Sequence, residues 1–172
     1  MKSLAEPEQI HPVQIRQMTA ADLAQVMAIA ASLPEAPHWP ESAYHTALNP
    51  VATPRRIALV AIGPQKQDVQ GFLVARLLLP QAELESIAVS AGSQRRGLGR
   101  LLFDALVNEV LDSDGLNSGI LEIVLELRAS NRTALAFYHS AGFAQNGIRR
   151  AYYADPVEDA VLMRFSVRPH RP

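Results

Sequence analysis

Residues 86–111 read SIAVSAGSQRRGLGRLLFDALVNEVL, which combines a strand, a turn and a helix in one segment. An apolar run typical of a strand leads into a turn that holds Gly97, Gly99 and three arginines, and an amphipathic helix follows. The first N–H groups of a helix have no partner within it, so they can bind an anion. Glycine lets a large anion approach the backbone, and arginine adds charged donors. The stretch predicts a pyrophosphate site; a tight turn with solvated arginines is the alternative.

Two better-known phosphate motifs do not fit this turn. Gly92 and Gly97 have the spacing of a P-loop, but Leu98 stands where that motif needs lysine. The dinucleotide fingerprint needs a third glycine at a position where this chain has Leu102. A pyrophosphate bound here would therefore be held by a loop of a different kind.

In the rest of the chain, hydrophobic periodicity and turn residues predict the remaining elements. Their order is one strand, two helices, three strands, a helix, a strand, a helix and two strands, which indicates a single α/β domain with a mixed sheet. We expect that domain over residues 13–167, with tails at 1–12 and 168–172. Strands are predicted at 13–18, 56–62, 70–79, 83–89, 120–127, 143–149 and 161–167, and helices at 20–32, 41–48, 97–112 and 131–140.

Composition excludes several classes of function. The net charge of the 172 residues is −1, so no global positive field indicates a nucleic-acid partner. Cysteine is absent, which rules out disulfides, thiolate metal sites and a cysteine nucleophile. The five histidines show no ligand spacing, and we expect no metal. The N-terminal residues lack a signal-peptide core, and no apolar run reaches the ~20 residues of a membrane span, so a cytoplasmic protein is expected.

A second informative stretch is ILEIVLELRASNRTALAFYHSAGF, residues 120–143. Strand alternation places Leu121 with the apolar side chains on one face and Glu126 on the other. Glu126 lies at the carboxyl end of the strand, where open α/β sheets bind ligands. Asn131 begins the next helix, and Tyr138 follows two turns later. Each also has a purely structural interpretation, as a solvated carboxylate, a helix cap or a core aromatic.

The segment Gln94–Gly99 resembles the Q/R-x-x-G-x-G/A motif of the GNAT acetyltransferases, and the order of elements fits their fold. LELRASNRTALAFYHSAGF and IRRAYY…EDAVLM resemble the RimI-type ribosomal-protein alanine N-acetyltransferases within this family. The resemblance covers about residues 13–166. It implies a mixed, mostly antiparallel sheet of about seven strands flanked by four helices, with strands that splay apart at the acetyl-CoA site.

The resemblance also implies roles for individual residues. It makes Glu126 the general base and Tyr138 the general acid for transfer from acetyl-CoA, without a metal. Its acetyl-CoA-binding residues would be Ile87, Ala88, Val89, Gln94, Arg95, Arg96, Gly97, Leu98, Gly99, Arg100 and Asn131.

The acceptor side of the site departs from the RimI pattern. Enzymes of that type usually have Pro-Trp where this chain has His38-Trp39, while Leu33-Pro34-Glu35 resembles the Leu-Pro-Glu of Ard1-type enzymes. Glu35 would then help to select the first residue of the acceptor; a solvated loop carboxylate is the alternative. Tyr152 and Tyr153 would line the peptide site with Trp39, or could be ordinary strand-edge aromatics. Glu83 and Glu85 are further candidates for the base, ranked below Glu126.

These features predict an N-terminal protein acetyltransferase that acts on a small first residue such as alanine in a ribosomal protein, without direct contact with nucleic acid or membrane. One alternative is a GNAT enzyme that acetylates a small-molecule amine, such as a polyamine, or a broader set of protein N-termini. Another is a coenzyme-A-binding module without turnover. An acidic acceptor pocket would favour a polyamine, and the presence of both Glu126 and Tyr138 argues against the inactive module.

Overall fold

The computed structural model describes residues 13–64, 68–112 and 119–167; the predicted tails lie outside them. The predicted order of elements is confirmed, and most boundaries fall within two residues. Two short 3-10 turns, Ala20–Asp22 and Ala91–Ser93, precede α1 and α3. The strands are β1 Gln14–Gln17, β2 Arg56–Ile62, β3 Val69–Leu78, β4 Gln81–Val89, β5 Glu122–Arg128, β6 Ala144–Ala154 and β7 Val157–Ser166, and the helices are α1 Leu23–Ser32, α2 Glu41–Leu48, α3 Leu98–Asp112 and α4 Arg132–Ser140.

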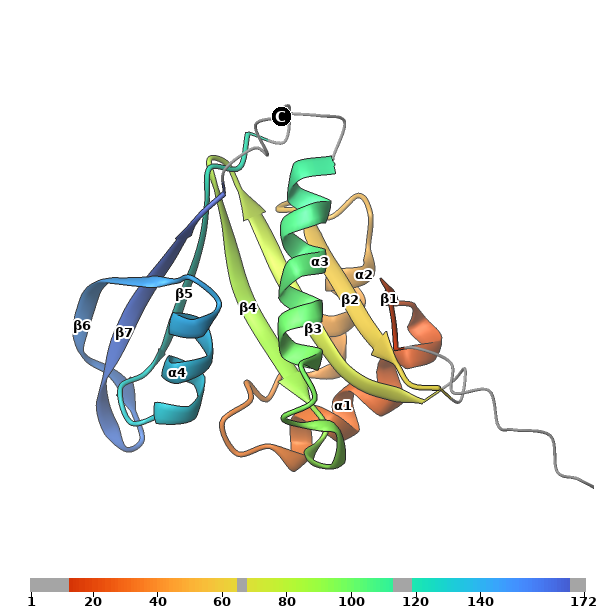
Figure 1. Cartoon of the computed structure of the whole chain (residues 1–172), viewed down its shortest axis with the longest axis horizontal. Helices are drawn as coiled ribbons and strands as arrows, with labels where there is room; N and C mark the ends of the chain where they lie inside the picture. Colours follow the sequence, from red (N-terminus) through yellow and green to blue (C-terminus); the bar gives the residue numbers. More distant parts are fainter. Residues whose placement is uncertain (1–12, 65–67, 113–118, 168–172) are drawn as a thin grey trace, which may run out of the picture.

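All seven strands form one sheet in the order β1-β2-β3-β4-β5-β7-β6. Neighbours are antiparallel except β4 and β5, which run parallel, so the expected mixed and mostly antiparallel sheet is confirmed. Helices α1 and α2 cover one face of β2–β4, and α3 covers the opposite face, where α4 lies over β5 and β7 (Figure 1). Strands β2 and β3 are apolar on both faces because helices lie on both sides of them.

The sheet splays apart between β4 and β5. These strands pair only at their first residues, with the last pair formed by Glu83 and Val124. Beyond that pair the two strands diverge toward the end where α3 begins (Figure 1). Next to the last β4–β5 pair, β4 also has a bulge in its pairing with β3. Leu84 and Ser86 pair with consecutive β3 residues, so Glu85 between them has no partner on β3. The splayed strands expected from the family resemblance are therefore present.

The last hairpin is longer than predicted, which corrects the loop expected over 150–160. Strand β6 continues to Ala154, and β7 begins at Val157. A bulge disturbs the pairing between Arg149 and Tyr153, and Ala151 has φ 49°. Asp159 fixes this bulge by accepting from the Ala151 N–H at 2.9 Å and from Arg150 at 2.6 Å. The bulge interrupts the two-residue alternation by which a strand is recognised in a sequence.

The strand predicted from residue 120 begins later, at Glu122. Leu121 precedes β5 and is 63% exposed, whereas Ile123, Leu125 and Leu127 share one buried face. The buried face of β5 begins only where the strand is paired on both sides.

Candidate functional site

The Gly-Arg turn links the splayed end of β4 to the N-terminus of α3. Gln94 Nε2 donates to the Val89 carbonyl at 3.1 Å, which ties the turn to the end of the strand. Arg95 and Gly97 both have left-handed backbone, with φ of 62° and 80°. A non-glycine residue in this region is unusual, and such conformations cluster at ligand-binding sites. Leu98 is buried beneath the turn and anchors the first turn of α3 in the core.

The two glycines serve different purposes. A Cβ on Gly97 would meet nothing within 4 Å, so this position needs glycine for its positive φ. A Cβ on Gly99 would lie 3.3 Å from the Phe137 ring, so Gly99 allows α4 to pack closely against the start of α3. The sequence predicts either glycines that let an anion approach the backbone or a tight turn, and the structure shows these two local requirements.

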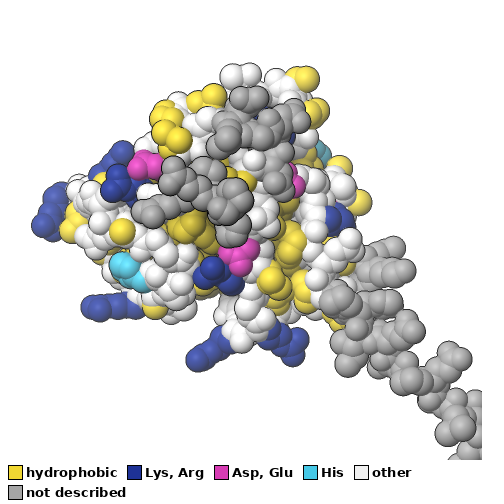
Figure 2. Space-filling model, turned by 45° about the horizontal axis from the view of Figure 1, so that its top comes forward, with side chains coloured by type: hydrophobic (Ala, Val, Ile, Leu, Met, Phe, Trp, Pro, Cys, Tyr) yellow, Lys and Arg dark blue, Asp and Glu magenta, His cyan; other side chains and the backbone are white. Residues whose placement is uncertain are grey.

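The three arginines of the turn differ in their partners. Arg100 donates to Asp104 at 2.8 Å and reaches the Ser140 carbonyl at 3.5 Å. Arg95 and Arg96 are exposed, and within the described residues no carboxylate lies at ion-pair distance from either. Figure 2 shows Lys and Arg side chains standing out at the lower end of the molecule, the end where this turn lies in Figure 1. Two unneutralised cations beside a helix N-terminus suit a phosphate-bearing ligand.

Glu126 lies on the face of β5 opposite the core. Ile123, Leu125 and Leu127 point into the core below α3 and α4, so alternation turns Glu126 to the side of α1 and α2. Its side chain is 24% exposed, and its Oε1 lies 3.1 Å from Arg149 Nη1 on β6. Glu85 on β4 lies at the same level across the splay, because both glutamates follow the Glu83–Val124 pair by two residues.

Glu83 and Glu85 on β4 are held by arginines of β2 and β3. Arg56 Nε donates to Glu85 at 2.7 Å, and Arg76 Nε lies 3.6 Å from the same carboxylate. Arg76 also donates to Glu83. Beside them, the Ser86 hydroxyl is buried without a protein partner among the described residues. Glu85 thus has two counter-ions and Glu126 has one, which keeps Glu126 the stronger candidate for the base.

Tyr138 lies on the other side of the sheet from Glu126. Its ring packs in the α3–α4 core, with edge contacts to Phe137 and Phe143 at centroid distances of 5.2 and 5.3 Å. Burial raises the pKa of the Tyr138 hydroxyl well above its ordinary value, so the group stays protonated. The structure therefore does not bring Glu126 and Tyr138 into contact, because the sheet lies between them.

Asn131 caps α4 as predicted, because its Oδ1 accepts from the Ala134 N–H at 3.1 Å. This interaction accounts for its position without a ligand. A contact between Asn131 and the coenzyme stays a prediction. The cap uses only Oδ1, which leaves the amide nitrogen available for such a contact.

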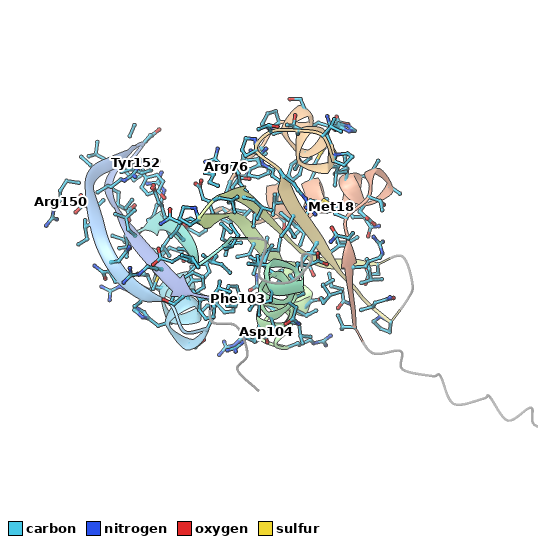
Figure 3. The ribbon with its side chains drawn as sticks, turned by 90° about the horizontal axis from the view of Figure 1, so that it is seen from above. Met18, Arg76, Phe103, Asp104, Arg150 and Tyr152 are labelled. Carbon is cyan, nitrogen blue, oxygen red and sulfur yellow. The ribbon has the colours of Figure 1, made fainter. Side chains whose placement is uncertain are left out.

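The predicted acceptor residues come from two separate elements. Glu35 is exposed in the loop after α1, and Trp39 is half-buried against Tyr44 at 5.3 Å between ring centroids. Tyr152 and Tyr153 lie on the last hairpin, with their ring centroids 5.2 Å apart. Tyr152 and Arg76 lie on the α1–α2 side of the sheet, opposite Phe103 and Asp104 (Figure 3). Arg149 contacts both Tyr152 and Glu126, so these two residues share one side of the sheet.

Sequence reasoning missed the arginines that surround Glu126 and the tyrosines. Arg149 pairs with Glu126 and lies over Tyr152, while the Arg128 guanidinium lies 4.2 Å from the Tyr153 ring centroid. Arg128 and the Ser130 N–H also bind Glu158, at 3.2 and 2.5 Å, which fixes the β5–α4 loop to the hairpin. Charge alternation along β5 and β6 was the available signal, but the partners depend on strand register.

Within the described residues, no group of three or more His, Cys, Asp or Glu side chains is arranged to hold a metal ion. The same residues contain no helix whose length and apolar character would let it cross a bilayer. An apolar hollow of about 390 Å³ lies beside α1 and is lined by Ala24, Met27, Ala28, Ala30, Ala31, His38, Trp39 and Tyr44.

Comparison with known proteins gives a consistent result. Residues 23–143 match the family model described as the Acetyltransferase (GNAT) family. The ribosomal protein bS18-alanine N-acetyltransferase of Salmonella typhimurium is 41% identical over 98 residues, which are 56% of this chain and 63% of that protein. The enzyme of the same name from Escherichia coli K12 is 38% identical over 105 residues, covering 60% of this chain and 68% of the relative.

Solved structures extend the match to most of the chain. The ribosomal-protein-S18-alanine N-acetyltransferase from Escherichia coli has a TM-score of 0.74 at 29% identity, covering 93% of this chain and 97% of that one. Ard1 from Thermoplasma volcanium has a TM-score of 0.76 at 24% identity, covering 91% and 99%, which is a likeness of fold.

Proposed function

Because this chain belongs to the GNAT acetyltransferase family, we propose that it transfers the acetyl group of acetyl-CoA to the α-amine of a protein N-terminus. The preferred acceptor is an N-terminal alanine of a ribosomal protein, which places the reaction in the cytoplasm. The relationship to bS18-alanine N-acetyltransferases at 38–41% identity carries this proposal. The splay between β4 and β5 and the Gly-Arg turn support it.

Acetyl-CoA supplies the activated thioester, and we assign its binding to the splay and the turn. Arg95, Arg96 and the first N–H groups of α3 would hold the pyrophosphate. Backbone groups of Ile87–Val89, beyond the last β4–β5 pair, would bind the pantetheine arm and stabilise the developing oxyanion. Most of the rate gain would come from positioning the two substrates together.

Glu126 would act as the general base. An α-amine has a pKa of about 8, so a modest base is enough to free its lone pair. Glu126 would accept that proton, directly or through a water, while the amine attacks the thioester carbonyl. The Tyr138 hydroxyl, protonated because of its burial, would donate a proton to the leaving thiolate. No acyl-enzyme is required, which is consistent with the absence of cysteine.

The charges on the acceptor side of the sheet favour a peptide over a polyamine. Glu83, Glu85 and Glu126 each have an arginine partner, and so does Glu122. A polyamine carries several positive charges, and four carboxylates matched by four arginines offer no excess negative charge for them. The exposed Tyr152 beside Tyr153 offers instead an aromatic surface suited to a peptide chain.

The test is mass spectrometry of acetyl transfer to a panel of peptides that differ in the first residue, with polyamines and N-terminally blocked lysine peptides included. We expect acetylation of the α-amine of Ala- and Ser-initiated peptides, and a loss of ~100-fold or more in kcat/KM for Glu126→Gln. Glu122→Gln is a matched control, because Glu122 lies on the same face of β5 and pairs with Arg164 at 3.1 Å. This control should keep near-wild-type activity.

Other outcomes would point to the alternatives. Transfer only to polyamines or lysine side chains would exclude an N-terminal acceptor while leaving an acetyltransferase. Binding of coenzyme A without transfer to any acceptor in the panel, including an Ala-initiated ribosomal-protein peptide, would favour the binding module without turnover.

A further inference from the structure

The candidate base, Glu126, forms an ion pair with Arg149. Arg149 Nη1 on β6 lies 3.1 Å from Glu126 Oε1 on β5, although β7 lies between these strands. Glu126 is registered opposite Leu162, and Arg149 opposite Ala160. The small Ala160 side chain leaves room for the arginine to cross β7 toward Glu126. The pair is open to solvent on the acceptor side of the sheet, because Arg149 is 54% exposed.

Arg149 also has a second partner within reach. Its guanidinium carbon lies 5.4 Å from the centroid of the Tyr152 ring, within the range of a cation–π contact. Tyr152 belongs to the bulge that Asp159 fixes through the Ala151 N–H. The backbone of β6 thus holds the Tyr152 ring close to Arg149. A small rotation of the Arg149 side chain would move its guanidinium from the Glu126 carboxylate onto this ring.

An acceptor amine with a pKa of about 8 arrives mostly as ammonium at neutral pH. Ammonium and guanidinium then compete for the same carboxylate. We propose that Arg149 is a positioning residue that occupies Glu126 in the free enzyme and is displaced onto Tyr152 by the acceptor ammonium. This inference rests on the proposed role of Glu126. It makes the pair a selective element, since an uncharged group cannot displace the arginine.

Removing Arg149 should therefore tighten acceptor binding. A solvent-exposed ion pair is weak, and its loss corresponds to roughly a two- to five-fold change in affinity. We would titrate an Ala-initiated peptide into enzyme saturated with coenzyme A, which cannot transfer an acetyl group, and measure Kd by calorimetry. Arg149→Gln should lower Kd by about two- to five-fold, while Arg149→Lys, which keeps the cation, should stay near wild type.

Arg164→Gln is the matched control. Arg164 pairs with Glu122 at 3.1 Å, and the exposure of both partners, 48% and 26%, is close to that of Arg149 and Glu126. Its removal should leave Kd unchanged. A Kd for Arg149→Gln that is equal to or above that of wild type overturns the proposal, as does an equal decrease in Arg164→Gln.

Two further measurements separate this mechanism from direct contact between Arg149 and the peptide. In a Glu126→Gln background, Arg149→Gln should no longer change Kd, because there is no carboxylate for the two cations to share. The same peptide with an acetylated N-terminus should bind equally to wild type and Arg149→Gln. An effect that persists in either case overturns the proposal. Failure of the proposed role of Glu126 would look different, since Glu126→Gln would then keep full transfer activity, and failure of the proposed function would show as no transfer from acetyl-CoA to the Ala-initiated peptide by the wild type.

Discussion

At the scale of single residues, the buried carboxylate of Asp22 fixes the entry to α1. It accepts from Arg16 Nη1 and Nη2, each at 2.8 Å, and from the Thr19 N–H and hydroxyl at 2.8 and 2.9 Å. The hydrogen bonds from Arg16, followed by those from Thr19, lower the Asp22 pKa to about 2 despite its burial. Thr19 and Asp22 could be identified from the sequence as a helix start, but the arginine could not, because it lies on β1.

This pKa gives a prediction for stability against pH. The folded pKa of Asp22 lies below its unfolded value, so its contribution is present above about pH 4 and is lost as pH falls toward 2. Asp22→Asn should lower the free energy of unfolding by about 2 kcal/mol at pH 7. Urea unfolding of both proteins between pH 7 and pH 2.5 should show the difference shrinking below pH 4. A difference independent of pH would mean that the ionised carboxylate is not its source.

At the scale of elements, α4 shows how a structural and a functional role can be separated at one residue. The Asn131 cap satisfies the Ala134 N–H, and a coenzyme contact would use the other atom of the same amide. Asn131→Ala should cost about 1 kcal/mol of stability, while Asn131→Ser should restore most of it because serine also caps helices. If Asn131 contacts the coenzyme, both variants should raise the KM for acetyl-CoA several-fold. If Asn131→Ser kept the wild-type KM for acetyl-CoA, Asn131 would serve only to cap α4.

The elements also show where prediction from sequence ends. The helices at 41–48 and 131–140 and the strand at 56–62 were found because apolar spacing and turn residues agree there. The hairpin of β6 and β7 was shortened in the prediction because the bulge at 150–152 breaks the alternation. That bulge depends on Asp159, whose importance is visible only once the two strands are registered.

At the scale of the whole molecule, the order of elements was sufficient to predict one α/β domain with a mixed sheet. The family resemblance added the splay, which no periodicity in the sequence expresses. The charge partners in the site could not be predicted, since Glu126–Arg149 and Glu85–Arg56 join strands that are distant in the sequence. The separation of Glu126 and Tyr138 by the sheet follows from three-dimensional packing as well.

The splay divides the sheet into two parts that acetyl-CoA would bridge. Strands β4 and β5 share only three pairs, so their lower ends lack the hydrogen bonds that a continuous sheet would supply. Two features hold these parts together on the α3–α4 side of the sheet. They are the contact of α3 with α4 at Gly99 and Phe137, and the core that both parts share. A ligand that forms backbone hydrogen bonds along β4 would complete this edge, as an added strand does.

Hydrogen exchange can test this bridging directly. Saturation with coenzyme A should slow amide exchange in residues 87–99, because the ligand covers the end of β4 and the N–H groups at the start of α3. Exchange in β1 and β2, at the far side of the sheet, should change only through global stabilisation, about 2.7 kcal/mol at 100 times Kd. Arg95→Gln combined with Arg96→Gln should weaken coenzyme binding without altering exchange in the free protein. If coenzyme A slowed exchange equally in all strands, or left residues 87–99 unprotected, the ligand would not lie in the splay.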